Sequence, residues 1–239
     1  MPSPSHPHPP AHLPGRPAAS RIVAWLDGVS PYWGPQLVVL SALLLDLVLP
    51  ERLTVGPRWL LPSVEGALLL ALAIASPHPR VRGSRLRRRL AILFIALVSA
   101  VNLFSLIELS HLLLHGRVQN GRELVFSGIV LWVTNVLLFG LWYFELDRGG
   151  PAARAADERK YADFFFVQMS DDAARYAMPG WKPRLVDYLY TSFTNATAFS
   201  PTDTMPLTPA AKWLMSIQAL GSLVTIGLVV ARAVNILQG

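Results

Sequence analysis

Five long apolar segments, separated by shorter polar ones, dominate the sequence. Each approaches the roughly 20 residues that an α-helix needs to cross about 30 Å of hydrocarbon. None shows the alternation of apolar and polar residues that is typical of a membrane β-strand. The pattern therefore predicts an all-α integral membrane protein with about five transmembrane helices. The predicted spans are residues 33–49, 59–75, 90–114, 124–146 and 213–237.

Two segments precede the first predicted span. Residues 1–19 are rich in Pro and His and contain no apolar stretch, which is typical of a disordered tail. Residues 20–29 place several apolar side chains near one face, which favours a short helix lying at the membrane interface. We expect residues 30–116 to form a three-span membrane region after them.

The composition supports a membrane location and excludes several kinds of chemistry. The chain is 52% hydrophobic and 15% charged, with a mean hydropathy of +0.40. It has no cysteine, which excludes disulfides, thiolate metal sites and a cysteine nucleophile. The net charge of +6 comes from arginines beside apolar segments, where membrane topology and anionic lipid head groups account for them. We therefore expect no nucleic-acid partner.

The distribution of arginine predicts an orientation in the bilayer. Six arginines lie in the short segment 80–89, which the positive-inside rule places on the cytoplasmic side of the inner (plasma) membrane. The long polar segment 147–184 follows two spans later and therefore falls on the same side. This pattern predicts a cytoplasmic amino terminus.

A polar stretch, "DYLYTSFTNATAFSPTDTMPLT" at residues 187–208, precedes the last predicted span. Its first part, residues 187–198, has apolar residues at helical spacing, but about twelve helical residues rise only some 18 Å, roughly half a bilayer. Ser200 and Pro201 then interrupt regular structure. A half-helix followed by an extended return and a full span is a re-entrant loop, which membranes tolerate only when protein or a water-filled cavity surrounds it.

Part of this stretch resembles the pore motif of tetrameric potassium channels. Residues 190–203 read YTSFTNATAFSPTD, against the general form Y-F-S-F-x-T-x-T-T-V-G-Y-G-D. The resemblance implies a channel-like pore module at residues 121–239, with an outer helix, a re-entrant loop at residues 187–205 and an inner helix with a hinge at Gly221. It also implies a homotetramer, because a single two-span module cannot enclose a pathway. The loop and the last span, ending in VNIL, also resemble an uncharacterised family of bacterial multi-pass membrane proteins.

The positions that correspond to the potassium filter contain no glycine. Glycine permits the left-handed backbone conformations that direct successive carbonyls at the ion, so we expect a filter that is not of the potassium type. Its hydroxyl and amide groups are weak polar ligands for small inorganic ions, and a ring of Asp203 carboxylates favours cations. The candidate filter and pore residues are Thr194, Asn195, Thr197, Ala198, Phe199, Ser200, Pro201, Thr202 and Asp203.

Potassium channels insert this loop from outside, whereas the arginine pattern places it on the cytoplasmic side. Either the loop is inverted, as in glutamate-receptor pores, or the family is oriented differently from the charge rule. A second interpretation of the loop is also open, because Ser200 and Thr202 are suited to capping the last helix, with Asp203 accepting its free N–H groups. The loop would then be a packed, closed element in a non-conducting scaffold or accessory protein.

The third predicted span carries a weak candidate metal site. Glu108, His111 and His115 follow an E-x-x-H-x-x-x-H spacing, which places them on one face of a helix. Such a face suits a membrane metalloenzyme, but one helix supplies only part of a ligand shell, so a hydrogen bond between Glu108 and His111 is the favoured interpretation. We expect no catalytic residues and no cofactor.

Overall fold

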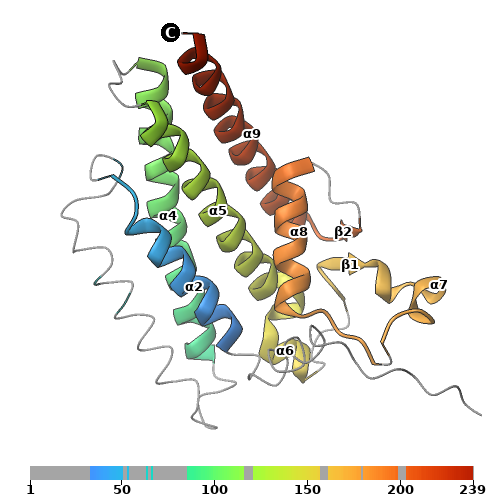
Figure 1. Ribbon diagram of the computed structural model, residues 1–239. Helices are drawn as coiled ribbons and strands as arrows, with labels where there is room; N and C mark the ends of the chain where they lie inside the picture. Colours follow the sequence, from blue (N-terminus) through green and yellow to red (C-terminus); the bar gives the residue numbers. More distant parts are fainter. Residues whose placement is uncertain are drawn as a thin grey trace, which may run out of the picture. The chain divides into compact units, whose positions relative to one another are not determined.

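The computed structural model describes residues 33–50, 53, 63, 66, 85–115, 121–156, 161–178, 180–198 and 203–238. These residues all belong to one compact unit, Pro31–Gly239, and most of them are helical (Figure 1). The elements are α2 (Trp33–Asp46), α4 (Arg85–His115), α5 (Gly121–Leu146), the 3-10 helix η2 (Asp147–Gly149), α6 (Pro151–Ala155), β1 (Phe164–Phe166), the 3-10 helix η3 (Val167–Met169), α7 (Asp171–Ala174), α8 (Leu185–Ala198), β2 (Thr204–Pro206) and α9 (Pro209–Gln238).

Three described helices are long and apolar enough to cross a membrane. They lie at Arg88–Leu114 in α4, Arg122–Gly149 in and after α5, and Pro209–Val234 in α9. The last three predicted spans are therefore confirmed as long apolar helices.

The first predicted span is shorter than expected. Helix α2 has 14 residues and ends at Asp46, and the chain then turns instead of continuing to residue 49. The tail at residues 1–19, the interfacial helix at residues 20–29 and the second span at residues 59–75 lie outside the described residues, except for two isolated positions in the second span.

Helix α5 is the centre of this unit. In its most apolar stretch 61% of the residues are buried, compared with 33% in α4 and 22% in α9. It packs against α2, α4, α8 and α9, as Figure 1 shows. The other long helices thus keep wide apolar faces that this unit does not cover.

Helices α5 and α9 run antiparallel in close contact. In the first third of α5, a Cβ added to Gly128 would lie 2.3 Å from a methyl carbon of Val229, in the last third of α9. Near the end of α5, the Tyr143 hydroxyl donates to the side-chain carbonyl of Gln218, in the first third of α9. Glycine at position 128 is therefore required for this approach of the two helices.

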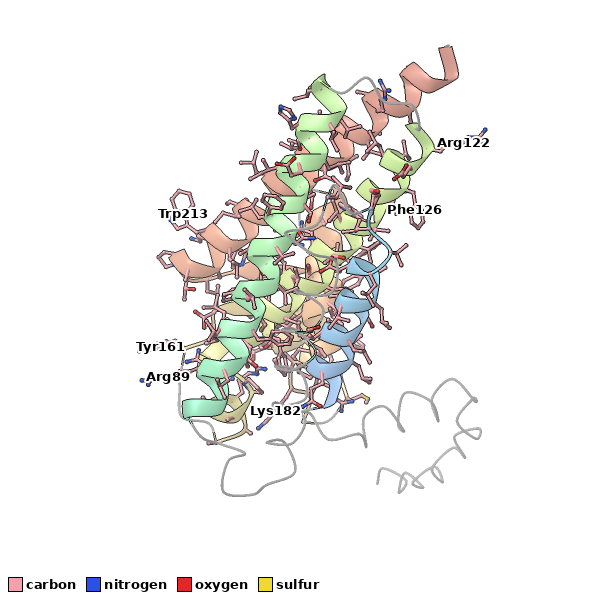
Figure 2. All side chains as sticks on the ribbon, turned by 90° about the vertical axis from the view of Figure 1, so that its left-hand side faces the viewer. Arg89, Arg122, Phe126, Tyr161, Lys182 and Trp213 are labelled. Carbon is pink, nitrogen blue, oxygen red and sulfur yellow. The ribbon has the colours of Figure 1, made fainter. Side chains whose placement is uncertain are left out.

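The starts of α4 and α8 meet the end of α5, and we call this region, with residues 147–184, the loop end. Arg88 in the first turn of α4 donates to the Glu145 carbonyl oxygen at 3.3 Å. Figure 2 shows Arg89 and Lys182 at this end and Arg122 toward the opposite one. The start of α4 and the long polar segment therefore lie at the same end, as the spacing of the spans predicted.

The chain turns sharply after α5. Arg148, Gly149 and Gly150 have positive φ angles of 51°, 81° and 96°, and glycine is the residue that adopts this conformation without strain at the end of a helix. Pro151 then occupies the first turn of α6, where its missing N–H costs nothing. This turn directs the chain back across the end of the helices.

A pair of short strands was not expected from the sequence. Strands β1 and β2 pair antiparallel, with Phe164 opposite Pro206 and Phe166 opposite Thr204. Strand β1 belongs to the segment that follows α5, and β2 belongs to the segment that precedes α9. Their pairing therefore holds these two segments together.

Candidate functional site

Helix α8 packs against α5 at Gly140 and at Trp132. Its Leu189 packs on Gly140, where an added Cβ would lie 2.6 Å from Leu189 Cδ2 and 3.1 Å from its Cα. Further along, the ring of Phe193 lies 6.1 Å from that of Trp132. The 14 residues of α8 rise only ~21 Å, and the helix ends at Ala198. A short helix is therefore present where the half-helix was predicted, and it lies beside helices that are long enough to cross a membrane.

A buried hydrogen-bond network, which we call the inner network, joins α8 to α5 and α9. Asn195 Nδ2 donates to the Met215 carbonyl and to Gln218 Oε1, both at 2.9 Å, and lies 3.3 Å from the Tyr143 hydroxyl. Gln218 Nε2 donates to Ser192 Oγ at 2.6 Å and to the Ser192 carbonyl at 3.0 Å. These polar side chains are almost fully buried, so the network fixes the rotation of α8 about its axis.

A second network, at the loop end, centres on Asp147, which we call the Asp147 hub. Its fully buried carboxylate accepts the N–H of Asp163 at 2.8 Å, the N–H of Phe164 at 3.4 Å and the hydroxyl of Tyr188 at 2.6 Å. The Arg154 guanidinium donates to the Asp147 carbonyl at 2.8 Å and lies 5.1 Å from the centre of the Tyr188 ring. The hub therefore ties the end of α5 to β1 and α8.

Asp163 extends the hub to α9. Its carboxylate accepts the N–H of Arg148 at 2.9 Å and the hydroxyl of Thr208 at 2.8 Å. The Thr208 oxygen in turn accepts the Ala211 N–H at 3.3 Å, which is an N-cap. The first turn of α9 is thus held by the segment that follows α5.

The return of the chain after α8 is fixed by β2. The hydroxyls of Thr191 in α8 and Thr204 in β2 lie 3.0 Å apart and are buried. The N–H of Val167 donates to the Asp203 carbonyl at 3.3 Å, which extends the pairing of the strands by one residue. Asp203 and Thr204 are therefore held beside Tyr190 and Thr191, in the first half of α8.

The predicted pore residues of α8 divide between two faces. Thr194 is half-buried and Thr197 is exposed, and their hydroxyls donate to carbonyls of Tyr190 and Phe193 in their own helix. Asn195 lies on the other face, in the inner network. The geometry thus places the two threonines at an outer edge of α8 and assigns Asn195 to internal packing.

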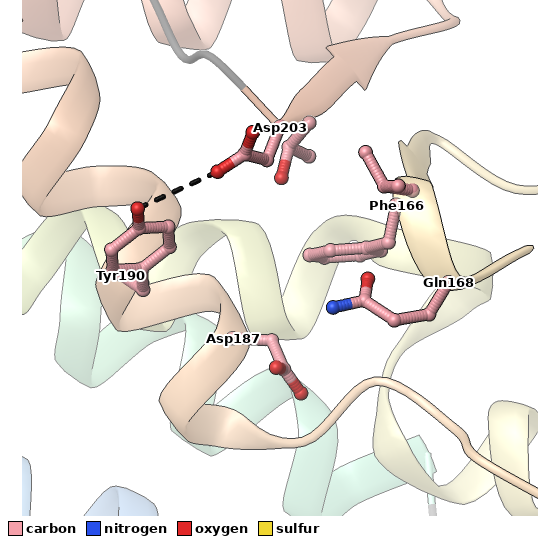
Figure 3. A pocket seen from close by; sticks show the side chains of 7 residues that line it. Phe166, Gln168, Asp187, Tyr190 and Asp203 are labelled. Atoms are coloured by element: carbon pink, nitrogen blue, oxygen red, sulfur yellow. Dashed lines mark hydrogen bonds between the residues drawn. The ribbon is translucent and has the colours of Figure 1, made fainter. Parts of the chain in front are cut away.

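The remaining predicted pore residues lie at or beyond the end of α8. Ala198 is its last residue, and Phe199, Ser200, Pro201 and Thr202 lie outside the described residues. Asp203 is exposed, and the hydroxyl of Tyr190 donates to its carboxylate at 3.5 Å (Figure 3).

Two predictions concern the last helix. Thr208 accepts the Ala211 N–H at its start, and the predicted cap residues Ser200 and Thr202 lie outside the described residues. Gly221 lies within the continuous helix α9, and a Cβ added there would meet no atom within 4 Å. A hinge at Gly221 stays a prediction.

The weak metal candidate gains no support from the described part of the chain. Glu108 is partly buried and His111 is exposed on α4, and the side chain of His115 is not described. Among the residues that are described, no three His, Cys, Asp or Glu side chains are grouped in a way that could hold a metal ion.

Asp187, in the first turn of α8, has a perturbed carboxyl group. Burial raises its pKa above the ordinary value, while the backbone N–H of Arg184, 2.6 Å away, and the Arg184 charge act in the opposite direction. Burial is the largest effect, so this carboxylate is only partly compensated.

No protein-family profile, curated protein or solved structure matches the chain. The function must therefore be inferred from the geometry of α8 and its surroundings.

Proposed function

We propose that this chain is an integral membrane protein and one subunit of a homotetrameric pore, in which α5, α8 and α9 form the conducting module. The observation that carries the proposal is the short length of α8, which starts at the loop end and ends after 14 residues at Ala198, beside helices that are long enough to cross a membrane. The last carbonyls of a helix have no partner within that helix. In hydrocarbon such groups are costly, so the end of α8 requires surrounding protein or a water-filled cavity.

The charge at the end of α8 favours cations. A helix carries roughly half a negative charge at its carboxyl end, and in α8 that end lies away from the loop end, toward the middle of α5. The hydroxyls of Thr194 and Thr197 line the outer edge of the same half of the helix. A cation at this position would therefore meet oxygen atoms and a favourable dipole, as in a cation pore.

We infer a tetramer because one module of α5, α8 and α9 cannot enclose an ion pathway by itself. Four copies around an axis would bring the ends of four α8 helices together and close the pathway. The arginines at the loop end favour its placement on the cytoplasmic side of the inner membrane. This orientation is opposite to that of potassium channels, so the proposed pore is inverted relative to them.

Ion flux tests the proposal. Purified protein in liposomes is expected to pass monovalent cations more readily than anions, because the α8 ends and Asp203 are negative. Asp203→Asn should lower the cation-to-anion preference several-fold, since one carboxylate per subunit is lost. Asp172→Asn, at an exposed carboxylate of α7, is the matched control and should leave the preference unchanged. Absence of flux for every small ion, with correctly folded protein, would overturn the pore.

A second candidate is a non-conducting scaffold that keeps the same architecture. The observation that favours it is Asn195, because this polar residue of the filter-like motif is buried and donates to groups of α9. A stable tetramer without flux would support the scaffold in place of the pore.

A further inference from the structure

A pocket of about 220 Å³ lies at the loop end, between the first half of α8 and the paired strands. Its walls come from three parts of the chain: α8, the β1–η3 segment and the residues at the start of β2. Figure 3 shows Asp203 and Asp187 on different sides of the space, with Tyr190 facing Phe166 and Gln168 across it.

We propose that this pocket binds a small organic cation through an ammonium group. The described residues of the lining include two carboxylates, two aromatic rings and one amide, and none of these described residues is basic. Carboxylates and aromatic rings are the groups that recognise ammonium ions in proteins, by charge-assisted hydrogen bonds and by cation–π attraction.

The size of the pocket distinguishes an organic cation from a bare metal ion. Its volume of about 220 Å³ corresponds to roughly seven water molecules at about 30 Å³ each, which is enough for several non-hydrogen atoms. No cluster suited to a metal ion occurs in the described ranges. An organic molecule that ends in an ammonium group fits both facts.

The two carboxylates keep acceptor capacity for such a ligand. Within the part of the chain that is described, the Asp203 carboxylate has one hydrogen bond, from Tyr190 at 3.5 Å. Asp187 accepts the Arg184 N–H through one oxygen. The Arg184 side chain offsets part of this charge from outside the lining.

This inference does not rest on conduction, although the pocket shares Asp203 with the proposed pore. Binding is measured on the full chain in lipid nanodiscs, where no flux is involved. Loss of flux and loss of binding are therefore separate results.

Calorimetric titration with butylammonium, and with 1-butanol as the neutral probe of equal length, tests the pocket. Butylammonium is expected to bind and 1-butanol is not. Asp203→Asn should weaken butylammonium binding by about tenfold or more, because a charge-assisted hydrogen bond contributes about 1.5–3 kcal/mol. Asp187→Asn should act in the same direction, and Asp172→Asn should leave the affinity unchanged.

Asp187 also accepts a backbone N–H at the start of α8, so Asp187→Asn could weaken binding by disturbing that helix. A further variant that keeps both aspartates is therefore needed. Gln168→Leu changes an exposed side chain of the lining and keeps both charges. It should weaken butylammonium binding by less than Asp203→Asn does. Equal binding of 1-butanol, unchanged affinity in Asp203→Asn, or binding of Mg²⁺ alone with the same dependence on both aspartates would overturn the proposal.

Discussion

Neighbouring polar residues of α8 have different partners, and this division determines what each can do. Asn195 and Ser192 point into the inner network, whereas Thr194 and Thr197 lie on the outer edge. The helical period of 3.6 residues produces this division. In the proposed pore the outer edge would face the ion, and the buried edge holds the helix in position.

Asn195→Ala is expected to destabilise the protein, because it removes the buried hydrogen bonds from Asn195 Nδ2 to the Met215 carbonyl and to Gln218 Oε1. Each such hydrogen bond contributes about 0.5–1.5 kcal/mol. The matched control is Thr197→Ala, which removes a hydroxyl that bonds only to its own helix and should change stability by less than about 0.5 kcal/mol. Thermal unfolding of the detergent-solubilised protein, followed by tryptophan fluorescence, measures both. Equal losses in the two variants would contradict the internal role of Asn195.

At the scale of elements, α8 depends on one close approach to α5. Gly140 leaves room for Leu189, and no larger residue could stand there without moving α8. Together with the inner network, this contact aligns α8 along the second half of α5. The depth at which α8 ends is therefore set by its neighbours as well as by its own length.

Gly140→Ala should destabilise the packing of α8 by about 1–3 kcal/mol, because the new Cβ would overlap Leu189, including its backbone. Gly227→Ala in α9 is the control, since a Cβ there meets nothing within 4 Å. It should be neutral or stabilising by up to about 1 kcal/mol, through higher helix propensity. Thermal unfolding checks both variants, and a loss in Gly227→Ala as large as that in Gly140→Ala would refute the steric explanation.

Elements whose signals are local could be predicted from the sequence. The three long helices follow from length and apolarity alone, and α8 follows from its short helical period before Ser200 and Pro201. Its end at Ala198 matches the predicted end of the half-helix.

Features that depend on contacts between residues distant in the sequence could not be predicted from the sequence. Strands β1 and β2 have three residues each and form only because they meet, so neither has a strand pattern of its own. Asp147 directly follows a predicted span and looked like an ordinary boundary residue, although it holds α5, β1 and α8 together. The burial of Asn195 likewise results from its contacts with α5 and α9, which are distant in the sequence.

At the scale of the whole molecule, the Asp147 hub and the inner network hold α8 at two levels. The hub acts at its start through Tyr188, and the inner network acts near its end through Asn195. A half-helix fixed at both ends keeps its outer edge in a constant position. In the proposed tetramer this rigidity would keep four such edges at equal distances from the axis.

The absence of native cysteine makes the tetramer directly testable by cross-linking. Thr197→Cys introduces one thiol near the carboxyl end of α8, on its exposed edge. If four copies bring these ends together, mild oxidation or a flexible bismaleimide should link subunits in the membrane, because the thiols face a shared axis.

Ile107→Cys, on an exposed position of α4, is the control and should stay unlinked, since α4 packs on α5 and α9 and faces away from that axis in the proposed assembly. Electrophoresis without reductant separates the outcomes. Linked Thr197→Cys with unlinked Ile107→Cys supports the central position of α8, whereas the reverse result would place α8 at the periphery and remove the basis for the pore.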